Sequence, residues 1–146
     1  MKHSMIILTA TLLITACSPV LPPDSPTNNE TPGGPASYAP RPGDEVLERG
    51  EVFLGSTEIL TMESYPLQFA VILNGDLPTP CHELRVATHE PDTQNRIKLE
   101  AYSLSDPNAV CAQVLEPFEQ NVNLGSFPSG HYTLWVNDRQ VGEFDA

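Results

Sequence analysis

Basic residues are scarce in this sequence, which has 7 lysines and arginines against 19 aspartates and glutamates and a formal net charge of −12. Nucleic acids and anionic lipid head groups are bound through basic patches, so this composition disfavours both as partners. The three cysteines include no C-x-x-C pair, and glycine-rich phosphate loops and D-x-D-x-D-G calcium loops are also absent. We therefore expect no cofactor and no bound metal.

Recognisable catalytic motifs are also missing. The stretch HELRVATHE lacks the second histidine that a zinc protease motif requires three residues after the glutamate, where Val86 stands instead. His82 and His89 are seven residues apart, on opposite faces of a regular strand, so a metal site with His131 requires loops to bring the three together. GSFPSG at 125–130 lacks the G-x-S-x-G order of a serine hydrolase. We predict that the protein is not an enzyme.

The longest apolar run near the start, residues 5–16, is only 12 residues long. A membrane-spanning helix needs about 20 residues, so this run is typical of the apolar core of a signal peptide. It ends in Ile14, Thr15, Ala16 and Cys17, a sequence that resembles the bacterial lipobox. The resemblance implies cleavage after residue 16, a diacylglyceryl group on the Cys17 thiol and acylation of the new amino terminus. The alternative is an ordinary secretory signal followed by an unrelated cysteine.

Lipidation at Cys17 predicts where the protein is found. Two or more acyl chains give stable anchoring, whereas one gives marginal binding, so the expected partner is a membrane reached through the acyl chains. We expect a lipid-anchored protein of the cell membrane or outer membrane that faces the periplasm or the exterior. Ser18 is not the aspartate that retains such lipoproteins in the inner membrane of enteric bacteria, which favours the outer membrane.

After the cysteine, residues 17–44 are expected to form a disordered tether. Residues 18–44 hold 8 of the 15 prolines and few aliphatic residues, too little apolar surface to offset the entropy of ordering. As a polyproline-like chain this tether would reach roughly 80 Å at about 3.1 Å per residue. Residues 45–146 are then one domain of ordinary size.

In the domain, apolar residues alternate with polar ones between frequent prolines and glycines. Leu67, Phe69, Val71 and Leu73 share one strand face, as do Leu84 with Val86, and Ile97 with Leu99 and Ala101. Further strands are expected at 58–63, 110–115, 122–124, 132–136 and 141–144. Seven or eight short strands without a helix predict an all-β fold, an antiparallel β-sandwich.

The run GHYTLWVNDRQVGEF predicts a hairpin in which Asn137 and Asp138 form the turn. Its G-x-Y-x-L-x-V pattern resembles a late strand of immunoglobulin-like and fibronectin-like domains, which implies a tyrosine corner at Tyr132. Leu134 should face the same side as Val141. Trp135 should point the other way, with Phe144 beside it. This exposed aromatic pair is a candidate partner-binding surface, unless the segment 118–127 covers it.

The remaining cysteines, Cys81 and Cys111, are an even pair in an exported domain, which favours a disulfide between them. The stretch from GDLPTPCHEL through GHYTLWVND is similar to small exported bacterial domains of uncharacterised function. That similarity supports the fold and the disulfide but implies no reaction.

Two function classes remain. The first is a tethered, non-catalytic binding module for an envelope or extracellular protein. The second is a protease inhibitor, a role for which exported immunoglobulin-like domains are used, with candidate loops at 74–80 and 106–109. An enzyme would need an unrecognised site in a deep pocket.

Overall fold

The structure of the protein is a computed structural model that describes residues 36–146. The predicted signal peptide, the predicted lipidation site Cys17 and the tether up to residue 35 lie outside the described residues.

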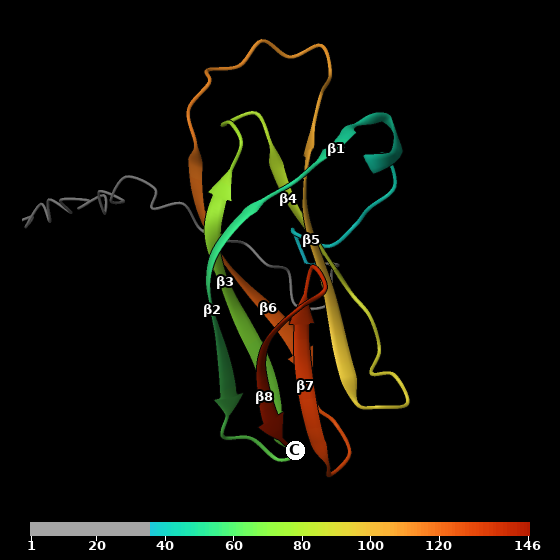
Figure 1. Ribbon diagram of the computed structural model, residues 1–146. Coiled ribbons are helices and arrows are strands. Elements are labelled where there is room, and N and C mark those ends of the chain that lie inside the picture. Colours follow the sequence, from blue (N-terminus) through green and yellow to red (C-terminus); the bar gives the residue numbers. More distant parts are fainter. Residues whose placement is uncertain (1–35) are drawn as a thin grey trace, which may run out of the picture. The chain divides into compact units, whose positions relative to one another are not determined.

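The described chain consists of strands joined by turns and loops, with one 3-10 helix (Figure 1). Its elements are η1 (Asp44–Val46), β1 (Glu48–Gly50), β2 (Phe53–Met62), β3 (Gln68–Leu77), β4 (Glu83–Thr88), β5 (Arg96–Ser105), β6 (Glu116–Gly125), β7 (His131–Val136) and β8 (Arg139–Asp145). The predicted all-β content is confirmed.

Two sheets pack face to face as a sandwich. The smaller sheet has the order β2-β3-β6. In the larger sheet β4 pairs with one side of β5, β1 and β7 pair with different parts of its other side, and β8 pairs with β7 (Figure 1). In the described residues five strand pairings are antiparallel, and β5 pairs with β7 in parallel. The predicted sandwich is therefore confirmed, with one parallel pair added to its antiparallel framework.

The core lies between the sheets and follows the predicted alternation. Phe69, Val71 and Leu73 of β3 face Ile97 and Leu99 of β5, all with at most 1% of their surface exposed. Leu67, predicted to share this face, precedes β3 and is exposed. One end of the core is aromatic: Phe69 stacks on Phe144 with ring centroids 4.1 Å apart, and Phe127 and Tyr132 complete the cluster.

The folded body begins before Glu45, so the predicted tether boundary at residue 44 is wrong. Tyr38 is buried in the core cluster. Its carbonyl accepts a hydrogen bond from the Val86 amide of β4 at 2.8 Å, and its hydroxyl accepts one from the Asn123 amide of β6 at 3.2 Å. Tyr38 thus connects β4, an edge strand of the larger sheet, to β6, an edge strand of the smaller sheet. A single aromatic residue in a proline-rich stretch buries enough apolar surface to dock that stretch.

The β7–β8 hairpin is confirmed, but a bulge in it changes the face on which Phe144 lies. Asn137 and Asp138 have φ of 47° and 62°, the backbone that a two-residue turn requires. Tyr132 donates a hydrogen bond to the Pro128 carbonyl at 3.0 Å, as a tyrosine corner does. A bulge beside Trp135 shifts the register, so Phe144 pairs with Tyr132 and faces the core. The prediction of an exposed Phe144 beside Trp135 is therefore wrong.

The strand predicted at 110–115 is also wrong, because residues 106–115 form a connection of turns and bends between β5 and β6. It starts with a turn in which the Ala109 amide donates to the Asp106 carbonyl at 3.0 Å. Its apolar side chains do not alternate between a buried and a wetted face, because no partner strand runs beside them. The following strand β6 is longer than predicted, with Val122 buried near its centre.

Candidate functional site

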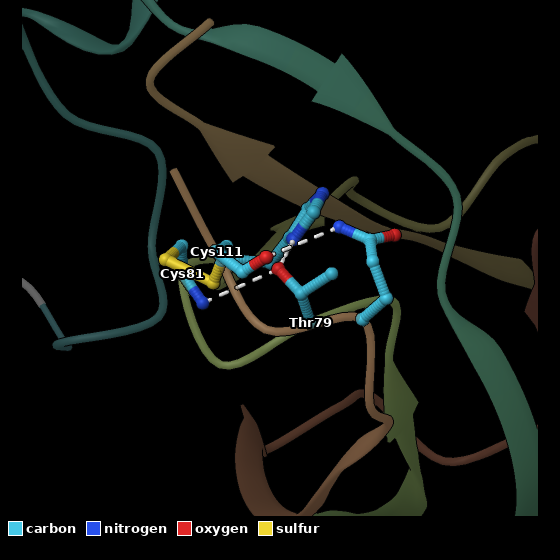
Figure 2. Close-up of a disulfide and its surroundings, with 5 residues drawn as sticks. Thr79, Cys81 and Cys111 are labelled. Atoms are coloured by element: carbon cyan, nitrogen blue, oxygen red, sulfur yellow. Dashed lines mark hydrogen bonds between the residues drawn. A yellow bond between two sulfur atoms is a disulfide. The ribbon is translucent and has the colours of Figure 1, made fainter. Parts of the chain in front are cut away.

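The predicted disulfide between Cys81 and Cys111 is present at one end of the sandwich (Figure 2). It joins the β3–β4 connection to the β5–β6 connection, with Cα atoms 6.0 Å apart. Thr79 supports it, because its hydroxyl accepts a hydrogen bond from the Cys81 amide and bonds to Nδ1 of His82 at 2.8 Å. The bridge holds the two neighbouring loops together, and the Thr79 bonds order the loop that carries Cys81.

Large apolar side chains are exposed around this bridge. Val110 is fully exposed, and Val114 and Leu115 are more than half exposed. Phe53 pairs with Asp76 near the end of β3, which places its half-exposed ring at the same end of the smaller sheet. We call Phe53, Val110, Val114 and Leu115 the apolar end. Exposed apolar groups held on a rigid frame are typical of a protein interaction site.

The candidate loops of the inhibitor hypothesis both reach the apolar end, but one is shorter than predicted. Residues 74–77 belong to β3, so only the part after Leu77 is a connection. Residues 106–109 are an exposed turn, in which the Asn108 amide also donates to the Asp106 carboxylate at 2.8 Å. The apolar residues after this turn belong to the strand that the sequence predicts at 110–115 and that the structure does not contain. The turn-forming Asp106-Pro107-Asn108 and the nearby Cys111 were the available signals against that interpretation.

A second feature is an open concavity of about 860 Å³ on the larger sheet, lined by parts of β1, β5 and the β7–β8 turn. Here the Arg49 guanidinium lies 3.8 Å from the centre of the Tyr102 ring and donates to Glu100 at 3.0 Å. His89 faces the same carboxylate at 3.4 Å. Hydrogen bonding from Arg49 is the main cause of the lowered pKa of Glu100. Arg49 and Glu100 therefore neutralise each other on this face.

Asn137 closes a gap in the same region. β5 is paired by β7 at its start and by β1 at its end, which leaves the stretch between them without a strand on that side. The Asn137 side chain accepts from the Ala101 amide at 2.9 Å and donates to the Ala101 carbonyl at 2.8 Å. The Asn137 side chain therefore makes the two hydrogen bonds that the backbone of a neighbouring strand would make with Ala101. The position of Asn137 in a turn sequence did not predict this structural role.

The histidines considered for a metal site are held by different partners. His82 bonds to Thr79, His89 faces Glu100, and His131 bonds to Asp145 at 2.8 Å with its pKa raised mainly by that bond. Among residues 36–146, no three histidine, cysteine or acidic side chains are grouped as metal ligands would be.

Trp135 lies on the outer face of the larger sheet, as predicted, and is partly buried there. Its indole N–H donates to the Thr133 hydroxyl at 3.1 Å. The segment 118–127 does not cover it, because Phe118 and Phe127 pack against the core between the sheets. Trp135 therefore does not form the predicted aromatic pair with Phe144.

The most buried charge of the described chain is Arg85 of β4, whose side chain is 2% exposed. Asp44 accepts two hydrogen bonds from its guanidinium, at 2.8 and 3.0 Å, and Glu83 accepts a third at 2.8 Å. The bond from Arg85 is the main cause of the lowered pKa of Asp44. This ion pair fastens the segment before β1 to the outer face of β4.

The lowered pKa of Asp44 predicts a loss of stability in acid. Because the folded-state pKa lies below the ordinary value of 3.8, the stabilisation is complete above that pH and is lost as the pH falls through the folded value. Urea unfolding of the wild type and of Asp44→Asn should therefore differ most at neutral pH and converge below about pH 4. The exposed variant Glu90→Gln is the control. A constant difference between wild type and Asp44→Asn down to pH 3 would contradict this prediction.

Comparison with known proteins identifies a family to which this chain is similar. A family model of the ORF11 β-sandwich domain matches residues 71–146, which run from β3 to the last residue. The chain belongs to the ORF11 β-sandwich family. The matched part of this ORF11 domain contains both cysteines of the disulfide and the whole β7–β8 hairpin.

The chain is similar to an "Uncharacterized 10.2 kDa protein in HgiCIIM 5'region" from Herpetosiphon aurantiacus. The two are 33% identical over 88 residues, which cover 60% of this chain and 93% of that protein. No solved structure matches the chain. Within the described residues, no helix has the length and apolar character needed to cross a membrane.

Proposed function

We propose that the protein is a lipid-anchored component of the cell envelope that displays its β-sandwich as a non-catalytic binding module. The lipobox-like sequence at Ile14–Cys17 and the proline-rich stretch after it support the anchor and the display. The proposed partner is an envelope or extracellular protein that binds the displayed sandwich.

The observation that carries the binding role is the apolar end. Val110, Val114 and Leu115 expose their side chains to water on a connection that the Cys81–Cys111 bridge holds to the neighbouring loop. Exposing these groups costs free energy that a single-chain fold would recover by burying them. A partner that covers them would recover it on binding, and the bridge lowers the entropy lost in that step.

A paired capture experiment tests the binding role. The tethered protein is used as bait against extracts of its own cells, together with Val114→Asp/Leu115→Asp at the apolar end and Tyr65→Asp in the β2–β3 connection. Tyr65 is fully exposed at the opposite end, so it is a matched control. We expect a protein that the wild type and Tyr65→Asp capture equally and that the apolar-end variant captures about tenfold less, since two buried charges replace apolar contacts. Equal capture by all three would contradict the proposal.

The anchor is tested separately with Cys17→Ser. Without the thiol no diacylglyceryl group is attached, so the variant should move from the membrane fraction to the soluble fraction. Its urea unfolding midpoint should equal that of the wild type, because residue 17 belongs to the predicted tether and not to the predicted domain. The measurement is cell fractionation with mass spectrometry of the native amino terminus. Unchanged membrane association, or a free thiol at residue 17 of the native protein, would refute the anchor.

Protease inhibition is a second candidate, and one observation favours it. The exposed turn at 106–109 is two residues from the bridged Cys111, so it is restrained in the way that a pre-organised inhibitory loop requires. The full protein at micromolar concentration is added to serine, cysteine and metalloprotease assays. If none is slowed, this candidate is wrong, and the capture result above is unaffected.

A further inference from the structure

The outer edge of β2 differs from the other sheet edges of the domain. In the described residues the edge of β4 receives the Tyr38 carbonyl, and the edge of β6 meets the Tyr38 hydroxyl and contains Pro117. The β8 edge carries three charged residues among seven. β2 is ten residues long and pairs only with β3 on its other side. Its sequence FLGSTEILTM has one charge and no proline or lysine.

Such an edge lacks the usual protection against pairing with another strand. Proteins block long edges with lysines, prolines, bulges or covering segments. β2 has a bulge between Leu54 and Ser56, but from Ser56 to Met62 its register with β3 is regular. This stretch of seven residues presents backbone donors and acceptors to the outside in the pattern that an added strand requires.

The charge of the smaller sheet restricts what can pair there. The strands β2, β3 and β6 contain no lysine, arginine or histidine. Alternation with the buried residues places Glu58, Asp76 and Glu119 on the outer face. All basic residues of the described chain lie elsewhere: Arg41, Arg49, Arg85, Arg96, Lys98 and Arg139. The charged side chains on the outer face are therefore all acidic, and they lie among apolar and amide side chains.

We propose that the β2 edge, residues 56–62, binds an extended basic segment of a partner protein, which adds to the smaller sheet as its fourth strand. Backbone hydrogen bonds supply affinity, and basic side chains on the outer face of the added strand lie beside Glu58, with Leu60 and Met62 as apolar contacts. A second copy of this chain fits poorly, because its own β2 would bring another Glu58 and no cation. The proposal specifies the binding role proposed above, but it uses a surface separate from the apolar end.

The test uses the full protein and a fluorescent peptide of nine alternating lysines and valines. Fluorescence anisotropy should show binding, and hydrogen exchange should show new protection of amides in 56–62. Glu58→Lys should weaken binding about tenfold, because an opposite-charge pair becomes a like-charge pair. Glu90→Lys makes the same charge change in the β4–β5 connection and should leave the affinity within about twofold, since that connection belongs to the larger sheet and β2 to the smaller one.

A second peptide separates strand addition from simple charge attraction. N-methylation of alternate residues removes the backbone donors along one edge and keeps every lysine, so we expect it to lose most of the binding. Equal affinity of both peptides, or equal weakening by Glu58→Lys and Glu90→Lys, would overturn the proposal. So would a dimer in sedimentation experiments that dissociates in Glu58→Lys, because the occupant would then be a second copy. None of these outcomes changes the capture result at the apolar end.

Discussion

Replacing Phe69 with alanine is expected to lower the free energy of unfolding by about 3–5 kcal/mol, the usual cost of removing a buried phenylalanine. Phe69 has no exposed surface, stacks on Phe144 at 4.1 Å and contacts Phe127 at 6.1 Å between ring centroids. Its ring therefore links β3 of the smaller sheet to β8 of the larger one. The cavity left by alanine would remove contacts from two aromatic rings at once, those of Phe127 and Phe144.

Urea unfolding followed by tryptophan fluorescence measures this loss. The control is Phe53→Ala, because Phe53 is half exposed on the outer face of the smaller sheet and its removal leaves no internal cavity. We expect the control to lose less than about 1 kcal/mol. A Phe69→Ala variant as stable as Phe53→Ala would show that the aromatic cluster does not hold the sheets together.

Removing the disulfide with Cys81→Ala/Cys111→Ala should cost about 3.5 kcal/mol, the chain-entropy value for a closed loop of roughly 30 residues. The bridge joins residues 30 positions apart and also holds the connection that carries the apolar end. We therefore expect two effects: a lower unfolding midpoint, and faster proteolysis between residues 106 and 115, since that segment has no partner strand.

Reduction provides the internal control for this prediction. Wild type treated with dithiothreitol should unfold at the midpoint of the double alanine variant, and dithiothreitol should not change that variant. If the wild-type midpoint does not change on reduction, the bridge adds nothing to stability. The apolar end would then need another source of rigidity.

The two proposed binding surfaces, the apolar end and the β2 edge, belong to the same sandwich and can be tested separately. The apolar end depends on the bridge, whereas the β2 edge depends on the smaller sheet, so the double alanine variant separates them. This variant should reduce capture at the apolar end and leave peptide binding at β2 nearly unchanged. Residues 56–62 pair with residues 68–74 of β3 and not with the loops that the bridge joins.

The sequence by itself determined the features that depend on neighbouring residues. Alternation with a period of two identified the buried faces around Val71, Val86 and Leu99, because a strand places every second side chain on one face. Asn137-Asp138 identified the hairpin, since these residues tolerate positive φ. The even pair of cysteines identified the bridge.

Only the tertiary structure decided the features that depend on distant residues. Tyr38 is part of the core because β4 and β6 meet beside it, which no local pattern shows. Phe144 is buried because one extra residue in the β8 register reverses the faces of the strand. Val110, Val114 and Leu115 are exposed because no strand runs beside them, although their composition suits a strand. Periodicity predicts which residues share a face, but pairing across the fold decides which faces are covered.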